Sequence, residues 1–246
     1  MLIELLADIA KMIFFIACAY AAINVYARRV HSDQTERLTK RRVAILGILT
    51  LAVSAIKVVE DVVAKESGPV DEMVLWFIRD HVPSSLTAFF TLVTLSGSWS
   101  FLLPVTLIAT AALLIARRCA EAVLLAASMI TAPLVVYALK MIVNRTRPTL
   151  WETQWYWGSS FPSGHTLTIA AFSTSAALCL ARIAPRVGNL AMSIAAIWIG
   201  LVAVSRLVLG VHWPTDVLAA ICIGAFIPLA ISVAFELHAP AYPSVR

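Results

Sequence analysis

The chain has 246 residues, of which 61% are hydrophobic and only 13% are charged, and its mean hydropathy is +0.88. An ordinary globular domain carries about 25% charged residues, because a soluble fold must cover its surface with polar side chains. This composition excludes a water-soluble domain. Repeated apolar runs of about 20 residues instead predict an all-α, polytopic membrane protein.

The cations and the cysteines fit a membrane protein better than a nucleic-acid-binding or disulfide-rich one. The formal net charge is +5, but Lys and Arg gather at the ends of apolar runs, so we expect no nucleic-acid partner. The four cysteines lack CxxC spacing and are interpreted as packing residues: Cys18, Cys119, Cys179 and Cys222. The N-terminus has acidic Glu4 and Asp8 and no basic segment, so it does not have the form of a cleavable signal peptide.

The apolar runs predict seven candidate membrane-spanning helices. They cover about residues 9–27, 43–63, 100–116, 122–143, 165–180, 190–209 and 217–236. Charged residues interrupt the first run, so residues 2–27 either span the membrane or begin at its interface. Lys57 and Asp61, near the end of the second run, are expected to pair at i,i+4 close to the lipid headgroups.

Between the second and third runs, the sequence predicts a helix that lies on the membrane. Residues 70–82 set apolar side chains against charged ones, as in an interfacial amphipathic helix. The apolar set is Val74, Leu75, Phe77 and Ile78, and the charged set is Asp71, Glu72, Arg79 and Asp80. A second short run, residues 84–95, ends at the Ser-Gly-Ser turn of residues 96–98.

Lys and Arg in the short loops predict the orientation of the chain. The set expected on the cytoplasmic side is Arg28, Arg29, Arg37, Lys40, Arg41, Arg42, Arg117, Arg118, Arg182, Arg186 and Arg246. The opposite side holds Lys65, Arg79, Lys140, Arg145, Arg147 and Arg206. We therefore expect residues 1–42 to form a hydrophobic helix and a basic cytoplasmic loop, residues 43–236 the membrane domain, and residues 237–246 a cytoplasmic tail.

Polar residues at the outer ends of the last four spans form the most informative pattern. Residues 161–165, Phe-Pro-Ser-Gly-His, predict a tight turn that feeds a helix N-terminus, and such a helix start attracts anions. Alternating topology places the neighbouring span ends on the same face. Together they carry Lys140, Arg147, Ser163, Gly164, His165, Arg206, His212 and Asp216. Snorkelling or helix capping explains each residue alone, but not their conjunction.

Phosphoryl transfer is the chemistry that suits this set. Arg147 and Arg206 can hold a phosphate bidentately, and Lys140 adds a point charge. The backbone N–H groups of Ser163 and Gly164, with the Ser163 hydroxyl, would complete an anion-binding nest. No carboxylate cluster is available for a metal pair, so we expect neither metal nor cofactor, and the cations of the protein must stabilise the charge.

Two histidines can divide the remaining chemical work. One would attack phosphorus while a carboxylate orients it, and the other would protonate the leaving oxygen. Asp216 lies four residues after His212, across a Trp-Pro turn, so it can hold that imidazole. His165 is then the natural acid.

These residues resemble the motifs of the type 2 phosphatidic acid phosphatase (PAP2) superfamily, which also contains the vanadium haloperoxidases. The first motif, Lys, six residues, then Arg-Pro, runs here from Lys140 to Pro148. The second, Pro-Ser-Gly-His, is residues 162–165, and the third, Ser-Arg, five residues, His, three residues, Asp, is residues 205–216. The resemblance covers about residues 43–236, and residues 206–216 look like the bacterial integral-membrane branch.

The resemblance implies a helix bundle with a six-span core, which makes the first hydrophobic helix an addition to it. It also implies a metal-independent phosphatase that forms a phosphohistidine intermediate. In this chain, His212 would be the nucleophile, Asp216 its partner and His165 the acid and then the base. The remaining residues would bind phosphate: Lys140, Arg147, Ser163, Gly164 and Arg206.

The expected substrate is a membrane lipid phosphate, such as undecaprenyl pyrophosphate, phosphatidylglycerol phosphate or phosphatidic acid. The expected location is a bacterial inner membrane, with the site on the periplasmic side. A lipid phosphotransferase would use the same residues, and its phosphohistidine would be attacked by a second lipid instead of water. A vanadium haloperoxidase and a non-catalytic lipid transporter are the more distant alternatives.

Overall fold

The structure is a computed structural model that describes residues 2–30, 41–153 and 158–238, and all regular secondary structure in these ranges is helical. This confirms the predicted all-α class. The α-helices are α1 (Leu2–Val30), α3 (Arg42–Val63), α4 (Gly68–His81), α5 (Thr87–Leu95), α6 (Trp99–Ile115), α7 (Cys119–Val143), α8 (Gly164–Ile183), α9 (Gly188–Val208) and α10 (Pro214–His238). The predicted basic loop covers residues 28–42, but α1 continues to Val30, and residues 31–40 lie outside the described ranges. The predicted tail begins at residue 237, but α10 continues to His238, and residues 239–246 also lie outside the described ranges.

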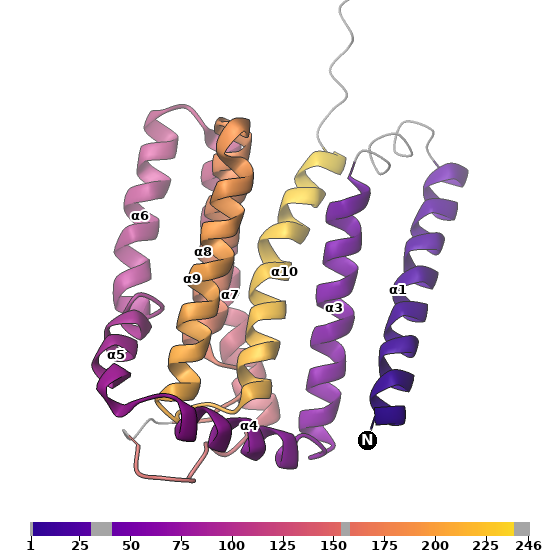
Figure 1. The fold of residues 1–246 in the computed structure, drawn as a ribbon. Helices are drawn as coiled ribbons and strands as arrows, with labels where there is room; N and C mark the ends of the chain where they lie inside the picture. The colour runs from indigo at the N-terminus through magenta and orange to yellow at the C-terminus, as the bar shows by residue number, and fades with distance from the viewer. Residues whose placement is uncertain (1, 31–40, 154–157, 239–246) are drawn as a thin grey trace, which may run out of the picture.

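The long helices stand side by side, as a membrane bundle requires (Figure 1). Among the described residues, six helices are long and apolar enough to cross a membrane by themselves: α1, α3 and α7–α10. The predicted span over residues 100–116 corresponds to α6, which has 17 residues and is at the short end of the range for a membrane-spanning helix. It follows α5 with a bend of 42° at the Ser-Gly-Ser turn, and the two helices together are long and apolar enough to form one broken span. The chain is therefore an integral membrane protein with up to seven crossings.

Helix α8 occupies the centre of the bundle, where it packs against α7, α9 and α10. Small residues allow the α8–α10 approach. A Cβ atom added to Gly224 of α10 would lie 2.5 Å from the carbonyl oxygen of Leu167 and 2.6 Å from the Cβ of Ala170. Glycine is therefore required at position 224, since the carbonyl it faces belongs to the backbone of a buried helix.

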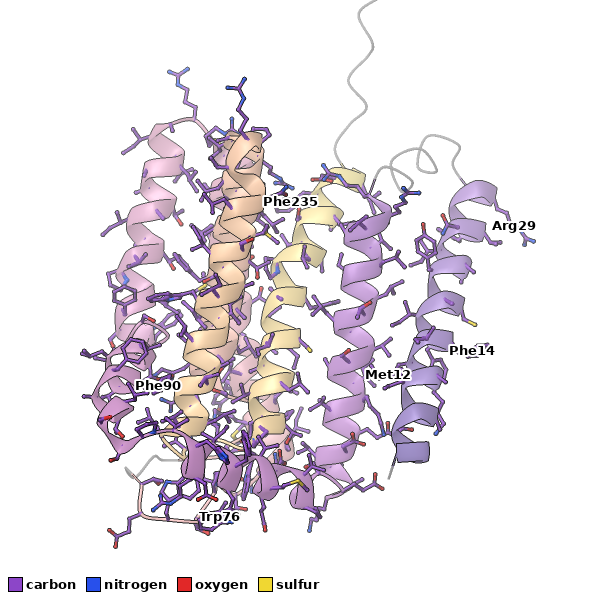
Figure 2. The ribbon with its side chains drawn as sticks, viewed as in Figure 1. Met12, Phe14, Arg29, Trp76, Phe90 and Phe235 are labelled. Atoms are coloured by element: carbon purple, nitrogen blue, oxygen red, sulfur yellow. The ribbon has the colours of Figure 1, made fainter. Side chains whose placement is uncertain are left out.

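Helix α1 stands at the edge of the bundle, next to α3 (Figure 1). Met12 lies on its α3 side, whereas Phe14 points away from the bundle and is 64% exposed (Figure 2). The predicted pair on α3 is confirmed, because Lys57 donates to Asp61 at 2.7 Å. The same ammonium group lies 3.5 Å from Asp8 of α1, so an ion pair helps to attach this additional helix.

Helix α4 lies across one end of the bundle, as predicted for a helix at the membrane surface (Figure 1). Glu72, Arg79 and Asp80 of the predicted charged set are exposed, but the fourth member, Asp71, departs from the prediction. Asp71 and Leu75 are fully buried, while the apolar Phe77 is 61% exposed. The buried face thus carries a carboxylate, because this group has hydrogen-bond partners inside the bundle that the sequence pattern does not reveal.

The end of the bundle opposite α4 is joined by ion pairs. Glu236 of α10 binds Arg182 of α8 at 2.9 Å and Arg41, just before α3, at 2.6 Å. Arg118 and Glu121 form a further pair of 2.6 Å at the start of α7. This is the end that the loop charges predict to be cytoplasmic.

The close contact between α8 and α10 gives a first prediction. We expect Gly224→Ala to destabilise the protein by about 1–3 kcal/mol, the usual cost of overpacking a buried contact. The measurement is thermal unfolding in detergent, with Gly47→Ala of α3 as the matched control, because nothing lies within 4 Å of a Cβ at position 47. Equal melting temperatures for the two variants would show that the α8–α10 contact is loose.

Candidate functional site

The structure brings all eight predicted site residues to the end of the bundle that α4 covers. Lys140 and Arg206 lie in the last turns of α7 and α9, Gly164, His165 and Asp216 in the first turns of α8 and α10, and Arg147, Ser163 and His212 in the adjoining turns. Direct contacts join several of them: Lys140 and Arg147 share the carbonyl of Ser159, Arg147 lies 3.4 Å from His212, and the N–H of Ser163 donates to the carbonyl of Asp216.

The turn between α9 and α10 is built to present His212. Gly210 has a φ of +65°, the left-handed conformation that commonly ends a helix. A Cβ there would meet the indole of Trp151 at 2.6 Å, so the turn also needs the space that glycine leaves. Pro214 then begins α10, where its missing N–H costs nothing, and Asp216 accepts from the N–H of Trp213 at 3.0 Å.

His212 is held between a carboxylate and a guanidinium group. Its Nδ1 lies 3.4 Å from Oδ2 of Asp216, and its Nε2 lies 3.4 Å from Nη1 of Arg147. A guanidinium group only donates hydrogen bonds, so Nε2 must be the acceptor and the proton must reside on Nδ1. This tautomer leaves a lone pair on Nε2, directed toward the cations of the site.

The surroundings of His212 keep its imidazole neutral. Burial lowers the pKa of His212 from its ordinary 6.5 to about 4, and the positive charges of Arg206 and Arg147 lower it too. Asp216 opposes this shift, because a nearby carboxylate favours the protonated ring. At neutral pH, Nε2 is therefore unprotonated and available as a nucleophile or base.

The three predicted phosphate-binding cations are positioned by neutral oxygen atoms. Lys140 and Arg147 both donate to the carbonyl of Ser159, and Arg147 also donates to the carbonyl of Val211 at 2.8 Å. Arg206 is almost completely buried, at 1% exposure, and donates to the hydroxyl of Thr94 on α5 at 2.7 Å. Guanidinium and ammonium groups placed in this way can share an anion among them.

One part of the predicted anion nest is wrong. Ser163 is the N-cap of α8, as expected, but its N–H donates to the backbone carbonyl of Asp216 at 3.2 Å. Its hydroxyl lies 3.0 Å from that of Thr166, and it makes no capping hydrogen bond to the backbone. The N–H of Ser163 is thus engaged in joining α8 to α10 rather than exposed at the helix start.

The sequence reasoning missed four residues that support the site: Asp71, Thr94, Arg145 and Ser159. Asp71 was assigned to the solvent side of a surface helix, and Arg145 was counted only as a loop cation. Arg145 could have been noticed, because it stands inside the Lys140–Pro148 motif. The other three lie far from the motifs or in a loop without a pattern, so their roles depend on the fold.

No group of three or more His, Cys, Asp or Glu residues that could hold a metal ion occurs within the described ranges. At the site, the carboxylate of Asp216 faces an imidazole and a guanidinium group. The arrangement can therefore bind an anion, supply an imidazole nucleophile and exchange protons through a second imidazole.

Residues 121–238 match the family model of the PAP2 superfamily. This region contains all eight predicted site residues. The chain is 37% identical over 76 residues to lipid A 1-phosphatase of Rhizobium johnstonii, an alignment that covers 31% of this chain and 28% of the relative. It is 37% identical over 87 residues to phosphatidylglycerophosphatase B of Escherichia coli, which covers 35% of this chain and 33% of the relative. The chain thus spans about a third of the length of these curated relatives.

The fold resembles the crystal structure of a transmembrane PAP2 type phosphatidylglycerolphosphate phosphatase from Bacillus subtilis. The TM-score is 0.68 at 25% sequence identity, and the match covers 77% of this chain and 99% of the other. The similarity therefore extends well beyond residues 121–238, and it leaves nearly a quarter of this chain without a counterpart.

The protonation state of His212 gives a second prediction. We expect this imidazole to titrate with a pKa of about 4, below its ordinary 6.5. Asp216→Asn should lower this pKa further and Arg147→Gln should raise it, because the carboxylate favours the imidazolium and the guanidinium opposes it. NMR of ¹⁵N-histidine-labelled protein measures the titration, with the His212→Gln spectrum assigning the resonance. A midpoint near 6.5 would contradict the buried, cation-flanked geometry.

Proposed function

Because this chain belongs to the PAP2 superfamily, we propose that it is an integral-membrane lipid phosphatase that hydrolyses a phosphomonoester or diphosphate of a membrane lipid. The observation that carries the proposal is the state of His212, whose neutral Nε2 faces the cations while its Nδ1 faces Asp216. An activated nucleophile beside positive charge is what phosphoryl transfer through a covalent intermediate requires.

In the first step, Nε2 of His212 attacks phosphorus and forms an N–P bond. The bond between phosphorus and the lipid oxygen breaks, and His165 donates a proton to that leaving oxygen. Asp216 stabilises the positive charge that develops on the imidazole of His212, as the carboxylate of a catalytic triad does.

In the second step, water replaces the nucleophilic histidine. His165, now deprotonated, takes a proton from the water as its oxygen attacks phosphorus, and the N–P bond of His212 breaks. Inorganic phosphate leaves, whether the substrate was a monoester or a diphosphate. Both histidines return to their starting protonation states. No external reductant, oxidant or metal is needed for this balance.

We expect the phosphate to bind between the three cations and the start of α8. Lys140, Arg147 and Arg206 would bind its oxygens, and Arg147 already touches the nitrogen that attacks phosphorus. Gly164 would contribute its backbone N–H from the first turn of α8. For Ser163 we retain the hydroxyl as the contact, since its N–H is engaged by Asp216.

The membrane and the relatives narrow the substrate to lipid phosphates. Candidates are undecaprenyl pyrophosphate, phosphatidylglycerol phosphate, phosphatidic acid and, from the R. johnstonii relative, the 1-phosphate of lipid A. We place the site on the periplasmic face of a bacterial inner membrane, because arginines gather at the opposite end of the bundle.

The decisive experiment measures phosphate release from each candidate lipid by the purified protein, and it gives the third prediction. His212→Ala and His165→Ala should each lower kcat by at least about 10³-fold, as loss of a residue from a cooperative catalytic set does. His81→Ala is the matched control, because His81 is exposed on α4 and should leave kcat unchanged. Full activity in a folded His212→Ala protein would refute the mechanism.

The products of the same assay separate the alternatives. Transfer of phosphate to an added acceptor lipid, in place of release to water, would make the protein a phosphotransferase. Lipid movement that survives His212→Ala would favour a transporter. Halide oxidation that requires vanadate and peroxide would identify a haloperoxidase.

The fourth prediction concerns inhibitors. EDTA should leave phosphate release unchanged, because the proposed charge stabilisation comes from Lys and Arg side chains. Orthovanadate should inhibit competitively, because it can adopt the five-coordinate geometry of the phosphorus in transfer. Loss of activity in EDTA that Mg²⁺ or Zn²⁺ restores would contradict the metal-independent mechanism.

A further inference from the structure

A buried ionic network connects the surface helix α4 to the catalytic end of α10. Asp71 of α4 and Asp216 of α10 are both fully buried, and Arg145 from the loop after α7 lies between them. Its Nη2 lies 2.6 Å from Oδ2 of Asp71, and its Nη1 lies 2.8 Å from Oδ1 of Asp216. One guanidinium group thus uses two of its nitrogens to bridge two carboxylates.

The two carboxylates use both of their oxygens in this network. Asp71 accepts the N–H of Thr215 at 2.9 Å and its hydroxyl at 2.7 Å, in addition to Arg145. Asp216 offers Oδ1 to Arg145 and Oδ2 to His212 and the N–H of Trp213. Arg145, together with the N–H of Trp213, therefore fixes the rotation of the Asp216 carboxylate, and this rotation directs Oδ2 toward Nδ1 of His212.

Asp71 binds two groups next to Asp216, the guanidinium of Arg145 and the first turn of α10. Its bonds to Arg145 and Thr215 fix both the guanidinium and the first turn of α10, the turn that contains Asp216. The charge of Asp71 also prevents Arg145 from being drawn entirely onto Asp216, since the two carboxylates compete for one cation.

The attachment of α4 does not depend on Asp71 alone. Leu75 is fully buried, the ring of Trp76 lies 5.6 Å from that of Trp151, and Arg79 lies 4.7 Å over the Trp151 ring. A variant that removes only the charge of Asp71 should therefore keep α4 in place. Attachment of α4 to the bundle therefore does not by itself explain why Asp71 is buried.

We propose that Asp71 is a positioning residue for the reaction: through Arg145 it holds Asp216, and through Asp216 it holds His212 in the Nδ1–H tautomer that leaves Nε2 able to attack. The side-chain contacts described for Asp71 are with Arg145 and Thr215, and neither of these residues is assigned to phosphate. Removal of Asp71 should therefore slow the chemical step without weakening binding. This inference rests on the proposed phosphatase function.

The test compares Asp71→Asn, which keeps the shape and removes the charge, with Asp80→Asn, an exposed acid on the same helix. We expect Asp71→Asn to lower kcat about 10- to 100-fold, by analogy with the loss that follows when an outer partner of a metal-bound histidine is changed. KM for the lipid phosphate should stay within about twofold, because the phosphate contacts are intact. Asp80→Asn should match the wild type in both constants.

A second measurement reports the tautomer of His212 directly. The ¹⁵N spectrum should show the Nδ1–H form in the wild type and in Asp80→Asn, and a mixture with the Nε2–H form in Asp71→Asn. A merely structural role of Asp71 would not change this ratio. If no lipid phosphate is hydrolysed by the wild type, the proposed function fails, while the tautomer ratio still decides the role of Asp71.

Two results would overturn the inference. One is an unchanged kcat and tautomer in a folded Asp71→Asn protein, and the other is a rise in KM at constant kcat, which would place Asp71 at the substrate. If Asp71→Asn does not fold, Thr215→Val removes the hydroxyl that bonds both Arg145 and Asp71 while all charges remain. That variant should shift His212 toward the Nε2–H tautomer and lower kcat, both by less than Asp71→Asn, because the Asp71–Arg145 contact remains. An unchanged tautomer and kcat there would contradict transmission through this network.

Discussion

The fork of Arg145 between Asp71 and Asp216 is the interaction on which the active end of this protein depends. Both carboxylates are fully buried, so each needs a partner that compensates its charge. Arg145 supplies that partner to both at once, at 2.6 and 2.8 Å. A buried ion pair adds little net stability compared with apolar packing, but it fixes geometry. The network therefore accounts for the fixed orientation of His212 better than for the stability of the fold.

The charges at this end also explain why it attracts a phosphate. Lys140, Arg145, Arg147 and Arg206 contribute four positive charges, and Asp71 and Asp216 two negative charges, so the formal balance is +2 while the histidines are neutral. That sum leaves out the proton that His165 donates in the proposed reaction, which adds one positive charge when it is present. A phosphate monoester carries up to two negative charges and would offset most or all of this positive balance. Burial of the cations in a medium of low dielectric strengthens their attraction for such an anion. The same charge keeps His212 unprotonated, which its role as nucleophile requires.

Much of the candidate site could be predicted from the sequence, because its spacings have direct geometric meaning. Alternating spans bring the ends of α7, α8, α9 and α10 to one face, so the motifs at those ends must meet. Asp71 could not be predicted in this way, since an acid in an amphipathic pattern normally faces water. Its burial is favourable because the fold brings Arg145 and Thr215 to its carboxylate. The N–H of Ser163 was likewise misjudged, because its acceptor is the backbone of Asp216, more than 50 residues away.

The two ends of the bundle show how the same residue types serve different purposes. At the end away from α4, Arg41 and Arg182 bind Glu236 and so join neighbouring helices, while Arg118 binds Glu121 at the start of α7. At the α4 end, Lys140, Arg147 and Arg206 donate to carbonyl and hydroxyl oxygens, which orient a cation without neutralising it. Arg145 instead binds two carboxylates, and it does so behind His212. The carboxylates therefore mark the side of the site that holds the nucleophile, His212. The anion would bind on the other side, where Lys140, Arg147 and Arg206 lie.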